Sequence, residues 1–211
     1  MDLFNHRAHQ AARDLSVWQA VDTELRHFVE EVDQNLPSQQ PDGFALGPGE
    51  QLVLQMVGVG LMEPHRARGT YEGGYAGVSL PSIGGMRPRI GATRGHYVQG
   101  PEVQQVMDTG RVVVTTERIV FTGPLHAMTW PLAKLLGVNP AEGAPATTLL
   151  PVQGREKVDA LVADNAGADE LRFRIKLAQA HHQGAAAVAA YKATLVDELA
   201  RHQATKPAAS G

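Results

Sequence analysis

With 211 residues, 43% of them hydrophobic, and a formal net charge of −3, the chain has the composition of a soluble globular protein and favours one domain with appendages over two equal domains. The absence of cysteine excludes disulfides, thiolate metal sites and a cysteine nucleophile, and it fits a reducing cytoplasm, where we expect the protein to reside. The N-terminus lacks an apolar signal-peptide segment, and the longest nearly apolar run, 52–62, is too short to span a bilayer, so we expect no transmembrane segment.

Residues 1–36 are predicted to form an N-terminal amphipathic helix. Apolar side chains recur at spacings of three and four between Leu15 and Leu36, and most charged residues fall on the other faces. Trp18 on the apolar stripe is interpreted as a packing anchor rather than a ligand platform. A helix of this length exceeds what a small domain needs as a lid, so we expect it to pair with another helix, of this chain or of a second copy. Residues 37–45, which contain two prolines, are predicted to be a linker.

The main domain is predicted to span residues 46–183 and to begin with a strand over residues 50–62. Gly58 and Gly60 in this strand suggest a β-bulge or a sharp bend, as small barrels use to close. The same two glycines also begin a dinucleotide-binding fingerprint. That interpretation is rejected because Glu63 stands in place of the third glycine and a proline follows it.

Residues 64–95 contain eight glycines, five arginines, no lysine and a single acid, Glu72, so their formal charge is +4 while the remainder of the chain carries −7. We predict a long surface loop with some strand character at 77–81 and 89–90. The positive electrostatic field of this loop should attract anions. The arginine guanidinium can bind a flat anion through two hydrogen-bond donors, and the tyrosine ring provides a flat face for stacking. The predicted binding residues are Arg66, Arg68, Tyr71, Tyr75, Arg87, Arg89 and Arg94. Two interpretations stay open: the arginines bind an anionic partner, or they pair with acids of the same chain.

A β-hairpin is predicted within residues 108–123, where two runs of β-branched residues flank a polar break. Its pattern is carried by Gly110, Thr115, Arg118, Phe121 and Gly123. This pattern resembles the hairpin of bacterial PH-like and GRAM-like domains, and residues 130–138 are similar to the next strand of that family. The resemblance implies a small, bent antiparallel barrel closed by a C-terminal helix, in a module that binds lipid headgroups, peptides or proteins. Phe121 and Trp130 are expected in the core of the barrel or at its mouth.

Other elements follow from local pattern. We predict strands at 93–103, 126–132, 147–153 and 157–164, a turn at Asp108 and a loop over 139–146. Asp108-Thr-Gly is also the short signature of aspartic proteases. That chemistry needs two carboxylates sharing a proton, and this chain has one such triplet with unsuitable flanking residues, so a turn that opens a strand is preferred.

Residues 168–183 carry conflicting signals. Apolar residues at every second position from 171 to 177 argue for a strand, whereas acids at the start, histidines at the end and a following glycine are typical of a helix. We predict a helix here and leave the strand open. Residues 184–203 are predicted to form a long C-terminal helix, and 204–211 a disordered tail.

No catalytic residue, metal site or cofactor is predicted. The histidines, among them His6, His9 and the adjacent His181 and His182, lack an acidic partner at ligand spacing, and phosphate-loop and nucleophile-elbow motifs are absent from the sequence.

Taken together, the predicted elements give an α+β fold, a PH/GRAM-like bent barrel between an N-terminal helix and a long C-terminal helix. The predicted function is non-enzymatic binding of an anionic partner: a lipid headgroup, a nucleic acid or an acidic protein surface. The alternative is a structural or adaptor subunit that forms homo-oligomers through its terminal helices.

Overall fold

A computed structural model of the chain describes residues 2–34, 36, 40–41, 43–66, 70–79, 89–98 and 102–207. For residues 2–12, 64–66, 70–79, 89–98 and 102–104 it describes the backbone alone. The fold is α+β, as predicted. Its elements in chain order are α1 (Asp2–Glu31), β1 (Leu52–Arg66), β2 (Thr70–Ser79), β3 (Arg89–Val98), β4 (Glu102–Thr115), β5 (Arg118–Thr122), β6 (Ala127–Pro131), the 3-10 helix η1 (Leu132–Lys134), β7 (Asn139–Ala141), β8 (Ala144–Leu150), β9 (Asp159–Val162), α2 (Asn165–Gln183) and α3 (Ala185–Ala204).

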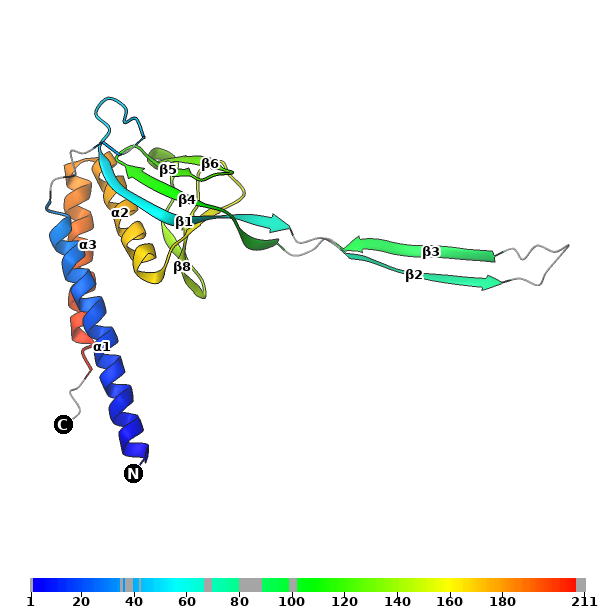
Figure 1. Cartoon of the computed structure of the whole chain (residues 1–211), viewed down its shortest axis with the longest axis horizontal. Coiled ribbons are helices and arrows are strands. Elements are labelled where there is room, and N and C mark those ends of the chain that lie inside the picture. Colours follow the sequence, from blue (N-terminus) through cyan, green and yellow to red (C-terminus); the bar gives the residue numbers. More distant parts are fainter. Residues whose placement is uncertain are drawn as a thin grey trace.

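Seven of these strands form one antiparallel sheet in the order β6-β5-β4-β1-β9-β8-β7, and β2 pairs with β3 in a separate two-stranded ribbon. Among the described strands, β6 and β7 are the edges of the large sheet, so the sheet is not closed into the barrel that the sequence predicted. Figure 1 shows α2 against this sheet, α1 and α3 side by side beyond it, and the ribbon projecting from the opposite side of the body. We call the seven-stranded sheet with its helices the body. None of the described helices is long and apolar enough to cross a membrane.

The centre of the sheet is the antiparallel pair β1–β4. Its register shifts at three places, and one of them confirms the predicted bulge: Val57 lies opposite Arg111 and Val59 opposite Gly110, which leaves Gly58 as an extra residue. Gly58 has a φ of 76°, a left-handed conformation that glycine adopts without a steric penalty. The bulge therefore lets the long strand β1 bend.

The predicted hairpin and its core residues are confirmed. β4 and β5 pair from Val114 opposite Ile119 to Arg111 opposite Thr122, and β6 continues the meander. Phe121 and Trp130 are fully buried, each with 0% of its surface exposed. They lie in the main hydrophobic cluster together with side chains from β1, β8, β9 and α2.

The helix prediction for residues 168–183 is confirmed, and the packing explains its strand-like pattern. Asp164 caps α2 by accepting a hydrogen bond from the Gly167 amide at 2.7 Å. Leu171 and Ile175 pack into the sheet cluster, whereas Phe173 and Leu177 pack against α1 and α3. Because α2 is a middle layer with two buried sides, apolar residues fall at every second position of a helix.

The N-terminal helix pairs with α3 of the same chain. Trp18 stacks on His202 with ring centroids 4.8 Å apart, and its Nε1 donates to the His202 carbonyl at 3.1 Å. Phe28 of α1 stacks on Phe173 of α2 at 4.3 Å. The interpretation of Trp18 as a packing anchor is thus confirmed, although the helix ends at Glu31 rather than at residue 36.

Three local predictions were wrong. The loop expected over residues 139–146 is the hairpin of β7 and β8, with Gly143 at its turn at a φ of 69°. Asp108 lies inside β4 rather than in a turn, because β4 begins at Glu102. The loop expected over residues 64–95 is largely β1, β2 and β3, while residues 67–69 and 80–88 lie outside the described part. In each case long-range strand pairing outweighed the local preference of Gly, Pro or Asp for turns.

Candidate functional site

The predicted binding residues fall on the ribbon and on the end of β1 that leads into it. Arg66 ends β1, Tyr71 and Tyr75 lie in β2, and Arg89 and Arg94 lie in β3. Arg68 and Arg87 lie outside the described residues. The segment singled out by its composition is thus a distinct structural unit, although it forms strands rather than a loop.

The register of the ribbon sorts these residues by face. Ten pairs run from Thr70 opposite Val98 to Ser79 opposite Arg89 without a shift. Since strand residues alternate between faces and opposite residues share one, a single face carries Tyr71, Tyr75 and Arg89. The sequence prediction missed Tyr97, which lies opposite Tyr71 and so belongs to the same face. We call this the tyrosine face of the ribbon.

Glycines separate the larger residues of the tyrosine face. Gly73 lies opposite Gly95, between the Tyr71 and Tyr75 rows, and a second glycine pair follows the Tyr75 row. Glycine has no side chain, so each glycine pair leaves a gap between rows of bulky residues. The glycines that suggested a loop are therefore spacers in a paired ribbon.

Two of the predicted arginines lie near acids of the same chain. Arg66 in β1 is directly opposite Glu102 in β4. Arg94 lies opposite Gly74, which places it diagonal to Glu72 on the face that does not carry the tyrosines. Opposite charges at such cross-strand positions attract one another. The register therefore places Arg66 and Arg94 at cross-strand positions beside an acid, whereas Arg89 lies opposite Ser79.

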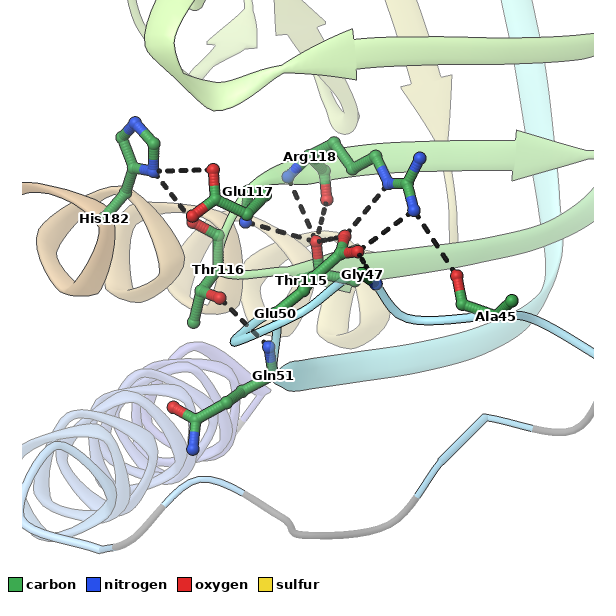
Figure 2. Close-up of polar contacts among 9 residues, drawn as sticks. All are labelled: Ala45, Gly47, Glu50, Gln51, Thr115, Thr116, Glu117, Arg118 and His182. Atoms are coloured by element: carbon green, nitrogen blue, oxygen red, sulfur yellow. Dashed lines mark hydrogen bonds and ion pairs between the residues drawn. The ribbon is translucent and has the colours of Figure 1, made fainter.

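Two residues of the hairpin motif, Thr115 and Arg118, belong to a different cluster, at the turn between β4 and β5 (Figure 2). Glu50 is the centre: its Oε1 accepts from the Thr115 hydroxyl at 2.6 Å and from Arg118 Nε at 2.9 Å. Its Oε2 accepts from the Gly47 amide at 2.6 Å and from a second Arg118 nitrogen at 3.0 Å. Burial raises the pKa of Glu50, but these hydrogen bonds outweigh that effect and lower the pKa below its ordinary value.

The Glu50 cluster fastens the segment before β1 to the hairpin turn. Thr115 also accepts from the amides of Glu117 and Arg118, and the Arg118 guanidinium lies 5.3 Å from the centre of the Phe44 ring. His182 at the end of α2 joins from the other side, with Nδ1 3.0 Å from the Thr116 carbonyl (Figure 2). All these groups are engaged within the chain, so the motif residues Thr115 and Arg118 have a structural role.

Asp108 is likewise bound by its own chain. Its Oδ2 accepts from the amides of Leu125 and His126 at 2.8 and 2.7 Å, and Oδ1 accepts from the Thr109 amide at 2.9 Å. Burial raises the pKa of Asp108, and the three amides lower it further than burial raises it. A carboxylate held in this way ties β4 to the loop after β5, which argues against the protease interpretation.

The two hairpin glycines are required for space rather than for turn conformation. A Cβ on Gly123 would lie 2.4 Å from Asp108 Oδ2, and one on Gly110 would lie 2.3 Å from the Thr122 carbonyl oxygen. Neither has a positive φ. The glycines of the hairpin pattern therefore mark close packing, Gly123 against the Asp108 carboxylate and Gly110 against the backbone of Thr122.

A hollow of about 280 Å³ lies between the three helices. Phe28, Phe173 and Leu195 line its apolar part, and Glu24 and Lys176 are among the charged residues beside it. Burial, followed by the charges of Asp169 and Glu170, raises the pKa of Glu24. Because both acids and bases line the hollow, it offers no surface of a single charge for an ionic ligand.

Within the part of the chain that the structure describes, His, Asp and Glu side chains do not gather in any group of three that could hold a metal ion. His6 and His9 have side chains outside the described part. Comparison with known proteins gives no match, neither to a family profile nor to a curated protein.

Proposed function

We propose that this chain is a non-enzymatic binding protein that contacts an anionic partner through the tyrosine face of its β2–β3 ribbon. The observation that carries the proposal is the register, which gathers Tyr71, Tyr75, Tyr97 and Arg89 on one face of a ribbon separate from the main sheet. Composition supports it, since residues 64–95 carry a formal charge of +4 in a chain whose net charge is −3.

The chemistry of the tyrosine face favours flat anions. An arginine guanidinium binds phosphate or carboxylate with two parallel donors, and tyrosine rings provide flat faces and hydroxyl donors. Because Figure 1 shows the ribbon extending away from the body, a partner can reach this face without displacing a helix. The shared chemistry of the partner is therefore an exposed phosphate or carboxylate group beside a surface that accepts stacked rings.

The body supports binding rather than catalysis. The buried carboxylates Glu50, Asp108 and Asp159 all accept hydrogen bonds from their own chain. Asp159, for example, accepts from the Trp130 indole at 2.8 Å and from Arg155 at 2.7 Å. A general acid or base needs a reachable oxygen, and these oxygens are occupied by structural donors.

A PH/GRAM-like architecture is part of the proposal. The sheet consists of two meanders, β4-β5-β6 and β7-β8-β9, joined through β1, and a helix that follows the last strand covers it. This arrangement supports the relationship that the hairpin pattern suggested. On this interpretation the ribbon is an insertion between the first two strands of the sheet, and it carries the binding surface of this particular chain.

The test compares Arg89→Gln with Arg94→Gln. Both changes remove one positive charge from β3, but Arg89 lies on the tyrosine face and Arg94 on the other. Binding would be measured with a labelled single-stranded oligonucleotide, with vesicles containing or lacking an anionic phospholipid, and with a polyglutamate peptide. We expect Arg89→Gln to weaken binding about tenfold, as the loss of a charge-assisted hydrogen bond does, and Arg94→Gln to change it much less.

The three probes distinguish the possible sources of the anion. Binding to the oligonucleotide that weakens steeply with salt indicates a phosphate backbone, whereas binding only to anionic vesicles indicates a lipid headgroup. Equal losses in the two variants would show that general positive charge, and not the tyrosine face, is responsible. No binding to any of the three probes would contradict the proposal.

Assembly through the terminal helices is the second candidate function. After α1 and α3 have packed together, Val17 and Val21 on α1 and Val196 on α3 remain exposed, by 65%, 37% and 44%. Where exposed apolar residues form a contiguous patch, they mark a contact with another protein, and we propose that these valines do so. Val17→Glu should reduce any oligomer that forms through this surface, measured by light scattering, and leave anion binding unchanged.

A further inference from the structure

The β2–β3 ribbon lacks what normally stabilises strands. Among the described strands, β2 and β3 pair only with one another, and no helix lies along them in Figure 1. An isolated two-stranded hairpin is marginally stable at best in water, and three or more strands are usually needed. Each strand also has one edge whose backbone groups lack a partner strand. A third strand on one of these edges would add the strand that the ribbon needs for stability and would give that edge a partner.

The two edges differ in how well they are protected. Proteins blunt exposed strand edges with charges, prolines and bulges. β3 carries Arg89, Arg94 and His96, whereas β2 has one charged residue, Glu72, and no proline in ten residues. The ribbon also has no register shift, in contrast to the three shifts between β1 and β4. The edge of β2 is therefore open to pairing with another strand.

The sequence of β2 fits a second copy of itself. On the tyrosine face its residues alternate as Tyr71, Gly73, Tyr75 and Gly77. We infer that two copies of this chain pair antiparallel through their β2 edges around a two-fold axis at Gly74. In this register each tyrosine of one β2 lies opposite a glycine of the other: Tyr71 opposite Gly77, and Tyr75 opposite Gly73. Aromatic–glycine pairs of this kind compensate for glycine in strands.

The other face agrees with the same register. Glu72 lies opposite Ala76 of the second copy, so the charge on β2 does not meet its own image, and Thr70 lies opposite Val78. Pairing β3 edges in the same way would instead bring two copies of an arginine-bearing strand together. A C2 contact uses one surface twice, and the β2 edge is self-complementary in this sense.

Pairing builds one continuous platform. A two-fold axis perpendicular to a sheet keeps each face on its own side, so the four strands β3-β2-β2-β3 carry the tyrosine faces of both copies together. The second copy thereby adds its own Tyr71, Tyr75, Tyr97 and Arg89 to the proposed binding surface. Dimerisation stands independently of anion binding, because it rests on the edge of β2 and on the spacing of tyrosine and glycine.

The absence of cysteine from the chain makes disulfide trapping a clean test. The residue at the two-fold axis, Gly74, lies opposite its own copy. The Cα atoms of such a pair are about 4.5–5.5 Å apart, which is within the range that a disulfide spans. Gly74→Cys should therefore give a covalent dimer under mild oxidation. The control is Gly95→Cys on β3, a glycine-to-cysteine change at the other edge of the ribbon, which should stay largely monomeric. Equal cross-linking of the two variants would overturn the proposal.

A second pair of variants keeps the test decisive if cysteine disturbs the strand. Gly77 and Gly91 lie opposite one another in the ribbon, on the same face but on different edges. Gly77→Lys adds two lysines to the dimer seam, whereas Gly91→Lys adds them to the outer edges. By light scattering across a dilution series we expect the parent to form a dimer, and Gly77→Lys to raise its dissociation constant about tenfold, while Gly91→Lys leaves it near the parent value. A monomeric parent at all concentrations, or equal effects of the two lysines, would refute the pairing.

Discussion

The body and the ribbon differ in how their polar groups find hydrogen-bond partners and in how their residues pack. In the body, Phe121, Trp130 and Leu171 have no exposed surface, and the buried carboxylates are fully engaged with donors of the same chain. In the ribbon, ten residue pairs join two strands that no helix covers in Figure 1, and two of these pairs consist of glycines alone. The proposed binding residues of the ribbon thus lie in a part of the chain separate from the buried polar clusters of the body.

This difference separates stability from binding within one chain. The polar clusters around Glu50 and Asp108 resemble catalytic sites in their residue types, but they hold segments of the body together. The segment that looks least structured by composition carries the proposed binding surface. Mutations in the body should therefore change the free energy of unfolding, whereas mutations in the ribbon should change association.

The largest effect is expected from Phe121→Ala. Its side chain is fully buried between strands and α2, so its removal should lower the free energy of unfolding by about 3–5 kcal/mol. Chemical denaturation of the variant and the parent would measure this. Val57→Ala is the matched control on the same sheet, because Val57 is 74% exposed, and its effect should be small. An unchanged midpoint for Phe121→Ala would remove the hairpin from the core.

The helical layer should respond next. Phe28 is 7% exposed and stacks on Phe173, so Phe28→Ala should cost about 3 kcal/mol. Leu25 borders the hollow between the helices and is only partly buried, so Leu25→Ala should cost less. Thermal melts of both variants would rank them. Equal, negligible shifts would mean that α1 is not docked on the body in solution.

Glu50→Gln should cost about 2 kcal/mol, below the roughly 3–5 kcal/mol of a fully buried ion pair, because Arg118 is 37% exposed. The loss should depend on pH. Folding lowers the pKa of Glu50, so its contribution is present above the ordinary glutamate pKa of about 4.3 and is lost as the pH falls toward the folded value. Denaturation curves measured between pH 7 and pH 3 should therefore give free energies of unfolding that differ between parent and variant at pH 7 and converge toward pH 3. Glu142→Gln, at an exposed turn, is the control and should shift nothing.

The smallest effect on stability is expected from removing the ribbon itself. Arg66 and Glu102 lie opposite one another at the ends of β1 and β4, so an Asn-Gly turn can replace residues 67–101. The shortened chain should unfold within about 1 kcal/mol of the parent, since closing a shorter loop changes the entropy little. It should lose both the anion binding and the dimer proposed for the ribbon. An aggregated or unfolded product would show that the ribbon belongs to the folding unit of the body.

Local signals in the sequence were sufficient where neighbours along the chain decide the structure. Gly58 marked the bulge, because an extra strand residue with positive φ is most easily a glycine. Asp164 and Gly184 marked the ends of α2, because helix ends need groups that satisfy free amides and carbonyls. The β-branched runs around Thr115 marked the hairpin, because strand alternation is visible over a few residues.

Only the tertiary structure decided which distant residues meet. Glu50 binds Arg118 across 68 positions of the chain, and nothing local to either residue indicates that contact. The two buried sides of α2 produced an alternation that resembles a strand until the sheet and the other helices are in place. The register of the ribbon placed Arg89 with the tyrosines, and the register of β1 and β4 placed Arg66 opposite Glu102. Strand pairing thus divided a set of arginines that composition alone treats as equal. Register and layer order arise from contacts between residues far apart in sequence, and local preferences do not encode them.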